Sequence, residues 1–176
     1  MARRNKTTHK IVRNRALAFA NDMKCVLKGK RGLEWQIGTA ESGTRECVDV
    51  IGWKNGKQRI QRVFIEVELR RIAPLGNVVK VWKQLTQKKP RKKLIMFQAF
   101  SLFYAKAGTQ RVNAQFVGRE MAKVCPVKYI TMTLKYRPAK RRANQPVMVG
   151  GGRRRDHAGN LARRIVARLS KMRFKA

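Results

Sequence analysis

The sequence predicts an α/β domain with a mixed central sheet flanked by helices. Apolar residues make up 43% of the 176 residues, which is enough for one compact domain with a core. Stretches with strand periodicity and stretches with helix periodicity follow one another along the chain. Strands joined by a hairpin come first and strands joined by helices follow, and this order implies a mixed sheet with helices on its faces.

The first half of the predicted domain contains a helix and three strands. The helix pattern has apolar residues at mixed three- and four-residue steps, and the strand patterns alternate or are rich in β-branched residues. Asn55 and Gly56 form a hairpin signal between the second and third strands. The helix is predicted over residues 11–27, and the strands over residues 33–38, 45–53 and 59–71.

The second half alternates helices with strands. Residues 94–104 are almost continuously apolar, which predicts a strand buried on both faces. The dipeptide of Cys125 and Pro126 ends the helix before the last strand. The predicted helices cover residues 77–87 and 112–124, and the last strand covers residues 129–136.

The chain is predicted to have three parts. Residues 1–10 form a basic arm, residues 11–136 form the α/β domain, and residues 137–176 form a basic linker and an amphipathic helix. That helix has apolar residues at Leu161 and Ile165 among arginines, so it can pack on the domain, follow a phosphate backbone or touch a membrane. The charge of the rest of the chain favours the phosphate backbone.

The charge predicts a polyanionic partner. The chain carries 43 lysines and arginines against nine acids, a formal net charge of +34. Residues 137–176 hold thirteen basic residues and one acid, a net charge of +12, which leaves +22 on residues 1–136. A field of this strength concentrates polyanions near the surface, so nucleic acid is the expected partner.

The cysteines and the apolar runs indicate the compartment. Cys25, Cys47 and Cys125 are odd in number and widely spaced, which excludes a zinc finger and a disulfide framework. We expect buried thiols in a reducing compartment. No apolar run approaches the roughly 18 residues of a membrane span, and no signal-peptide core is present. These features predict a cytoplasmic or nucleoid-associated protein that is not secreted and has no membrane partner.

Three of the nine acids lie on the second and third predicted strands: Asp49, Glu66 and Glu68. Period-two alternation puts all three on one face of the sheet. A tight Asn-Gly turn would set Asp49 opposite Arg62, whereas a longer loop centred between Lys57 and Gln58 would set it opposite Glu66. Only the longer loop brings the carboxylates together.

The acids allow two interpretations. They can form a solvated strand face whose charges pair with nearby arginines and contribute little. They can also converge on a divalent cation, because Mg²⁺ prefers hard oxygen ligands and needs only two or three carboxylates. The scarcity of acids and their apolar strand context favour the metal site. For Asp22 and Glu34, a salt bridge is the expected role.

An aspartate on one strand, Glu-x-Glu on the next, and then a helix, a buried strand, a helix and a strand resemble the PD-(D/E)XK nuclease superfamily, with its restriction-endonuclease-like core. The resemblance covers about residues 11–136. It implies that Asp49 is the first acid and Glu66 the second, and that Glu68 stands where the superfamily usually has lysine. Lys80 on the following helix is then the candidate for a relocated lysine.

The resemblance implies a nuclease that uses Mg²⁺ or Mn²⁺, held by Asp49, Glu66 and Glu68. Glu68 would ligate a second ion or act as a general base. We expect a DNA endonuclease, with DNA favoured over RNA and a homodimer as a possible assembly. The alternative is a non-catalytic nucleic-acid-binding protein, associated with the ribosome or with genome packaging. The basic residues expected to contact nucleic acid are Arg70, Arg71, Lys83, Arg141, Arg142, Arg153, Arg154, Arg155, Arg163 and Arg164.

Overall fold

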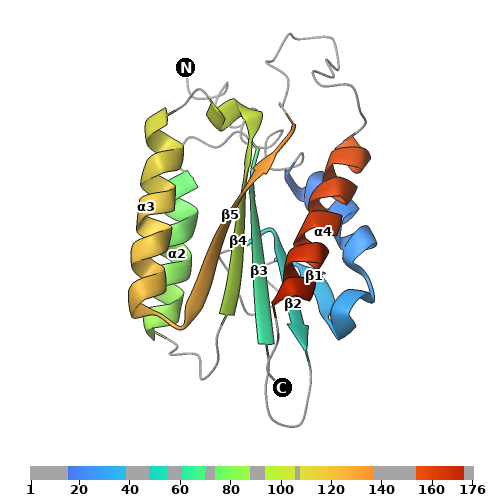
Figure 1. The fold of residues 1–176 in the computed structure, drawn as a ribbon, viewed down its shortest axis with the longest axis horizontal. Helices are drawn as coiled ribbons and strands as arrows, with labels where there is room; N and C mark the ends of the chain where they lie inside the picture. The colour runs from blue at the N-terminus through green and yellow to red at the C-terminus, as the bar shows by residue number, and fades with distance from the viewer. Residues whose placement is uncertain are drawn as a thin grey trace, which may run out of the picture.

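A computed structural model shows a five-stranded sheet between two layers of helices (Figure 1). The structure describes residues 16–38, 48–54, 61–69, 74–87, 94–105, 108–136 and 154–172. The predicted α/β class and the mixed sheet are therefore confirmed.

The strands lie in the sheet in the order in which they occur in the chain. β1, β2 and β3 pair antiparallel, whereas β3, β4 and β5 pair parallel because a helix separates each from the next. The strands are β1 (Glu34–Ile37), β2 (Val50–Lys54), β3 (Gln61–Glu68), β4 (Leu94–Ser101) and β5 (Val127–Leu134). Every residue of β4 is buried, as its apolar sequence predicts.

The register of β2 and β3 follows the longer loop. Val50 pairs with Ile65, and the same register continued by one residue sets Asp49 opposite Glu66. Arg62, which a tight turn would place opposite Asp49, pairs with Trp53 instead. The predicted hairpin residues Asn55 and Gly56 lie outside the described residues. The structure thus has the register that brings the acids together.

The helices cover both faces of the sheet. α2 (Pro74–Gln87) and α3 (Gly108–Val124) lie on one face, and the helix over residues 16–27 and α4 (Arg154–Lys171) lie on the other (Figure 1). Two short 3₁₀ helices, η1 (Lys30–Gly32) and η3 (Leu102–Ala105), connect elements.

Several element boundaries differ from the predictions: β2 begins only at Val50, β3 ends at Glu68, and β5 covers Val127–Leu134, two residues earlier than predicted. α2 begins at Pro74, three residues early, because a proline in the first helical turn loses no hydrogen bond. α3 begins at Gly108, ahead of its first large apolar residue. The apolar run after Ser101 leaves the sheet and continues as η3, since periodicity alone cannot separate a strand end from a 3₁₀ turn.

The sheet separates two apolar cores. Val63, Ile65 and Val67 of β3 pack in the core under α4 and the N-terminal helix. Phe64 of the same strand packs in the core under α2 and α3. The faces predicted from the alternation of β3 are confirmed, and Glu66 and Glu68 therefore point to the α2/α3 side.

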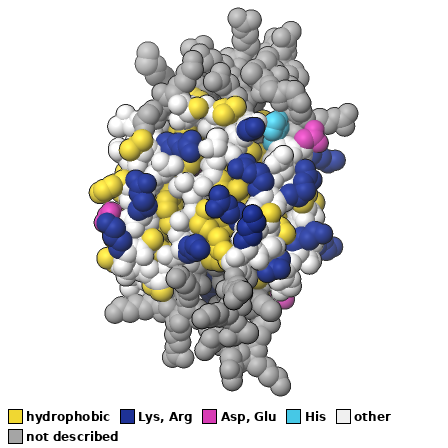
Figure 2. Space-filling view, in the orientation of Figure 1, with side chains coloured by type: hydrophobic (Ala, Val, Ile, Leu, Met, Phe, Trp, Pro, Cys, Tyr) yellow, Lys and Arg dark blue, Asp and Glu magenta, His cyan; other side chains and the backbone are white. Residues whose placement is uncertain are grey.

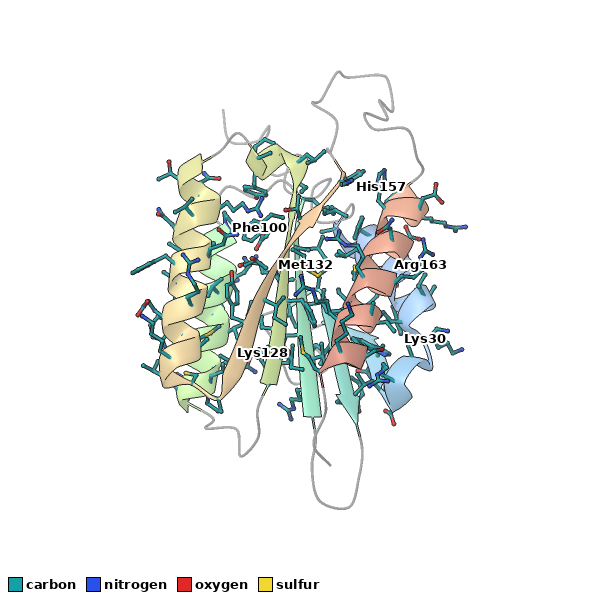
Figure 3. The ribbon with its side chains drawn as sticks, viewed as in Figure 1. Lys30, Phe100, Lys128, Met132, His157 and Arg163 are labelled. Atoms are coloured by element: carbon teal, nitrogen blue, oxygen red, sulfur yellow. The ribbon has the colours of Figure 1, made fainter. Side chains whose placement is uncertain are left out.

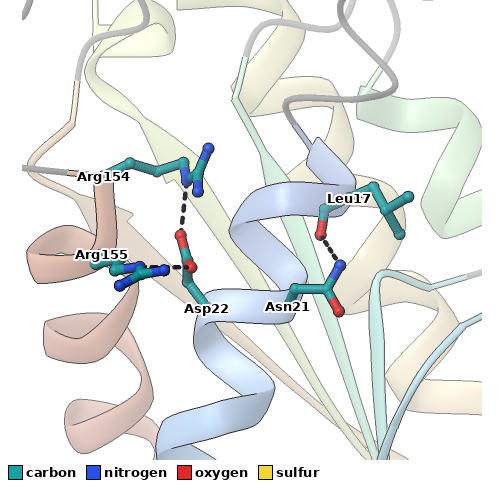
Figure 4. Close-up of polar contacts among 5 residues, drawn as sticks. All are labelled: Leu17, Asn21, Asp22, Arg154 and Arg155. Carbon is teal, nitrogen blue, oxygen red and sulfur yellow. Dashed lines mark hydrogen bonds and ion pairs between the residues drawn. The ribbon is translucent and has the colours of Figure 1, made fainter.

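α4 is part of the domain core. Its apolar stripe, including Leu161, Ile165 and Leu169, is fully buried against the sheet and the N-terminal helix. Of the alternatives for this helix, the structure shows packing on the domain. Arg154 and Arg155 pair with Asp22 at 2.6 and 3.5 Å, so Asp22 forms the expected salt bridge (Figure 4).

The cysteines do not all behave as expected. Cys25 is exposed, so the prediction of a buried thiol is wrong for it, and Cys125 is half-buried. Cys47 lies outside the described residues. Cys25 occupies the outer side of the N-terminal helix, two residues after the buried Met23. Among the described helices, none combines the length and the apolar character needed to cross a membrane.

Candidate acid site

Asp49, Glu66 and Glu68 lie at one end of the sheet, on the α2/α3 side. Asp49 immediately precedes β2, and Glu66 and Glu68 are among the last three residues of β3. Oδ2 of Asp49 accepts a hydrogen bond from the backbone N–H of Val67 at 2.7 Å. Asp49 is therefore tied to the backbone between the two glutamates.

The two glutamates are buried. Glu66 is 1% exposed and Glu68 is 0% exposed, while Asp49 is half-buried. The interpretation of these acids as a solvated strand face is wrong, since that interpretation requires contact with water. Burying a carboxylate has a large desolvation cost unless other groups compensate the charge, so the surroundings of this pair matter.

Asn77, in the first turns of α2, connects the glutamates. Its Nδ2 donates to Oε1 of Glu66 at 2.5 Å and to Oε1 of Glu68 at 2.9 Å. The two carboxylate oxygens consequently lie no farther apart than the sum of these distances. Because helix N-terminal turns also carry a positive partial charge, α2 presents both a donor and a favourable dipole to the pair.

Gln98 of β4 holds Glu68 from the neighbouring strand. Its Nε2 donates to Oε1 of Glu68 at 2.8 Å and to the carbonyl of Pro74 at 3.1 Å. The hydroxyl of Tyr129 on β5 donates to Oε1 of Gln98. The phenol therefore sets which end of the Gln98 amide faces the acid. A polar chain runs across three parallel strands from Tyr129 to Glu68.

Tyr129 remains a phenol over the physiological range. Burial raises the pKa of Tyr129 far above its usual 10.0, and the nearby Glu68 raises it further. Arg119 and Arg111 lower this pKa to a lesser extent. A neutral phenol is the form that can donate to Gln98, so the electrostatics agree with the hydrogen bond.

Two glycines allow close packing at the site. A Cβ at Gly118 of α3 would overlap the ring of Tyr129, so this glycine lets the ring lie against the helix. A Cβ at Gly38 would overlap the backbone carbonyl of Val48, and the N–H of Gly38 donates to the carbonyl of Asp49 at 3.1 Å. The backbone that carries Asp49 is therefore held directly against the end of β1.

The donor set suits a hard divalent cation. Within the described residues, no three Asp, Glu, His or Cys side chains form a group ready to hold a metal ion. The half-buried Asp49 and the adjacent Glu66 nevertheless supply the carboxylate oxygens that Mg²⁺ prefers, and Mg²⁺ usually takes only one or two protein carboxylates. Among the described residues, the side chains that contact these acids offer oxygen and nitrogen atoms only, and oxygen ligands suit a hard cation such as Mg²⁺.

The predicted basic residues that the structure describes lie on two helices, α2 and α4. Lys80 and Lys83 are exposed on α2, and Lys80 lies one turn beyond Asn77 without a hydrogen bond or ion pair in the described part of the chain. Four predicted arginines are exposed on α4: Arg154, Arg155, Arg163 and Arg164. The others lie outside the described residues: Arg70, Arg71, Arg141, Arg142 and Arg153.

The sequence-based prediction missed the neutral partners of the acids. Gln98 is the one polar residue of β4 before Ser101. A glutamine in an otherwise apolar, buried strand is unusual, so the sequence alone could have identified Gln98 as a residue with a buried polar partner. Asn77 lies beside the apolar stripe of α2 and faces the sheet, a position that periodicity could have identified. Tyr129 had no such signal, because a tyrosine in an alternating strand is ordinary.

Comparisons with known proteins gave no relative. The chain matches no family model, no curated protein and no solved structure.

Proposed function

We propose that this protein is an enzyme that hydrolyses phosphodiester bonds in nucleic acid. The observation that carries the proposal is the pair of buried glutamates bridged by Asn77, beside Asp49, in a chain of net charge +34. A polycation that only packages nucleic acid needs no acids in its interior, and such acids oppose the binding of phosphate. Their presence is explained if they act together with a cation.

More specifically, we propose a DNA endonuclease of the PD-(D/E)XK type that uses Mg²⁺ or Mn²⁺. The order of elements supports this, because β1, β2 and β3 are antiparallel and β4 and β5 follow in parallel with helices between them. The opposition of Asp49 and Glu66 supports it further. A DNA substrate would also place the protein in the cytoplasm or the nucleoid.

In the proposed reaction, the residues of the site would have different roles. A bound Mg²⁺ stabilises developing negative charge on the phosphate and lowers the pKa of a water molecule. Asp49 and Glu66 would hold the ion, and the amides of Asn77 and Gln98 would keep Glu66 and Glu68 in place. Glu68 would accept the proton of the attacking water or contribute to a second ion site. Lys80, exposed one turn from Asn77, would supply positive charge near the phosphate.

A non-catalytic nucleic-acid binder is the second candidate, and the surface over β5 and α4 favours it. Lysine and arginine side chains are spread over this face (Figure 2). The exposed residues there include Lys128, Lys135, Arg163, Arg164, Arg168 and Lys171. Phosphate contacts of this kind account for most non-specific affinity and need no catalytic group.

Cleavage of plasmid and branched DNA in Mg²⁺ or Mn²⁺ tests the enzyme proposal. We expect Glu66→Gln to lower the cleavage rate about a thousandfold or more, because several kcal/mol of charge stabilisation is lost. Glu120→Gln is the matched control, since Glu120 is on α3 and pairs with Lys123 at the surface. Its cleavage rate should equal that of the wild type.

DNA binding in EDTA completes the test. Glu66→Gln should bind at least as tightly as the wild type, because it removes one of the acids that repel the phosphate backbone when no metal is bound. If the wild type binds DNA but leaves every substrate intact with both metals, the nuclease proposal fails and the non-catalytic binder stands.

A further inference from the structure

Arg111 lies on the same side of the sheet as the acid site and is not one of the basic residues predicted from the sequence to contact nucleic acid. It belongs to the first turns of α3 and is half-buried. Its guanidinium carbon lies 5.2 Å from the centroid of the Phe100 ring, and its Nη2 donates to Oγ1 of Thr133 at 3.0 Å. A ring and a hydroxyl therefore hold the guanidinium in one place.

The sheet register shows how close this place is to the acids. Glu68 of β3 pairs with Phe100 of β4, and Phe100 pairs with Thr133 of β5. The three residues form one row across the parallel strands, which are spaced about 4.8 Å apart. The guanidinium contacts both Phe100 and Thr133, so along this row it lies between one and two strand spacings from Glu68, above the same face of the sheet. Figure 3 shows Phe100 on the side of the sheet that faces α3.

Arg111 keeps hydrogen-bond donors for a ligand. Among the described residues, Arg111 has no carboxylate partner, whereas Arg154 and Arg155 pair with Asp22 and Lys123 pairs with Glu120. A guanidinium has five N–H donors in a planar fork that matches phosphate, and a fork already fixed by stacking loses little freedom on binding.

We propose that Arg111 binds a phosphate of the nucleic-acid backbone next to the phosphate that faces Asp49, Glu66 and Glu68. The location of the reacting phosphate rests on the proposed nuclease function, but the phosphate contact of Arg111 does not require cleavage. The ligand class is a phosphodiester chain, and Arg111 would fix where that chain lies relative to the acids.

Thr133 extends this contact toward α4. Arg164 of α4 donates from Nη1 to the backbone carbonyl of Thr133 at 2.8 Å, so two arginines approach Thr133 from opposite faces of the sheet. β5 is one of the two edge strands of the sheet, with no strand beyond it in the described part. A nucleic-acid strand whose phosphate is held by Arg111 would cross this edge at Thr133 and continue over the exposed arginines of α4.

Arg111→Gln tests the proposal, with Arg119→Gln as the matched control. Arg119 is exposed on the same helix, two turns farther along, and carries the same charge. Binding of a short duplex oligonucleotide is measured in EDTA over a range of salt concentrations, with thermal unfolding of each variant in parallel. We expect Arg111→Gln to weaken binding about tenfold or more, as for a charged hydrogen bond. We also expect a salt slope shallower by about one unit.

Two further variants keep the test decisive. Arg111→Lys retains the charge without the fork, and it should recover the salt slope but only part of the affinity. Thr133→Val removes the hydroxyl that holds Arg111 and should weaken binding about two- to threefold, within the value of one neutral hydrogen bond. These variants decide the matter if Arg111→Gln fails to fold.

The outcomes separate this proposal from the nuclease proposal. Equal losses of affinity in Arg111→Gln and Arg119→Gln, with equal salt slopes, would overturn the role of Arg111. A wild type that never cleaves, but whose binding depends on Arg111 and not on Arg119, would overturn the nuclease proposal and leave the phosphate contact standing.

Discussion

The two faces of the sheet differ in what they bury. Under α4 and the N-terminal helix, the core cluster consists of apolar side chains such as Phe19, Leu161 and Ile165. Under α2 and α3, the apolar core gives way at the strand ends to Glu66, Glu68, Asn77 and Gln98, which contact one another. The first face shows what this fold needs for stability. The second holds polar groups that apolar residues of similar size could replace, often with a gain in stability, so stability alone does not account for them.

The largest expected effect on stability is on the apolar face. Leu161→Ala should lower the free energy of unfolding by about 2–5 kcal/mol, because Leu161 is fully buried and its removal leaves a cavity. Urea denaturation measures the loss, with Ser170→Ala at an exposed position of α4 as the control. A loss near that of the control would mean that α4 is not a structural part of the domain.

A smaller effect is expected where α3 supports the polar chain. Gly118→Ala should lower the free energy of unfolding by about 1–3 kcal/mol, because the added methyl overlaps the ring of Tyr129 and must displace it. Gly76→Ala is the matched control, since a Cβ on Gly76 of α2 meets nothing within 4 Å. That control should be neutral or stabilising by up to about 1 kcal/mol. Equal effects in the two variants would contradict the close packing of Tyr129.

The smallest effect concerns the hydroxyl of Tyr129 and depends on pH. Tyr129→Phe should lower the free energy of unfolding by about 1 kcal/mol at neutral pH, the value of one hydrogen bond. The folded protein raises the pKa of this phenol, so above pH 10.0 the unfolded chain loses a proton that the folded protein keeps. The stability of the wild type relative to Tyr129→Phe should therefore fall as pH rises beyond that value.

Denaturation of both proteins between neutral pH and pH 11 checks this. Because both proteins contain the same lysines, the effect of lysine titration on stability cancels in the difference between them. A difference between the two proteins that stays constant across the range would show that Tyr129 has its ordinary pKa.

The relative placement of Asp49, Glu66 and Glu68 could largely be predicted from the sequence. Period-two alternation assigns Glu66 and Glu68 to one face of β3, and the two candidate loops leave only two registers for Asp49. The structure has the register that opposes Asp49 to Glu66. Strand sides follow from local pattern because each side chain of a strand points opposite to the next.

The rest depends on contacts distant in sequence. Gln98 contacts Glu68 across 30 residues and Tyr129 contacts Gln98 across 31, and no local pattern specifies such pairs. The arginines of α4 dominate its composition, so the helix resembles a nucleic-acid-binding tail, although its buried stripe completes a core. Only the neighbouring N-terminal helix and sheet reveal that role.

The contact between Gly38 and Val48 links the edge strand β1 to the acid site. β1 supplies none of the three acids, yet the peptide that carries Asp49 lies against its end, and the carbonyl of Asp49 accepts a hydrogen bond from the N–H of Gly38. Any side chain at Gly38 would push this peptide away and shift the first acid relative to Glu66. The position of the first acid thus depends on a residue at the edge of the sheet, through the backbone alone.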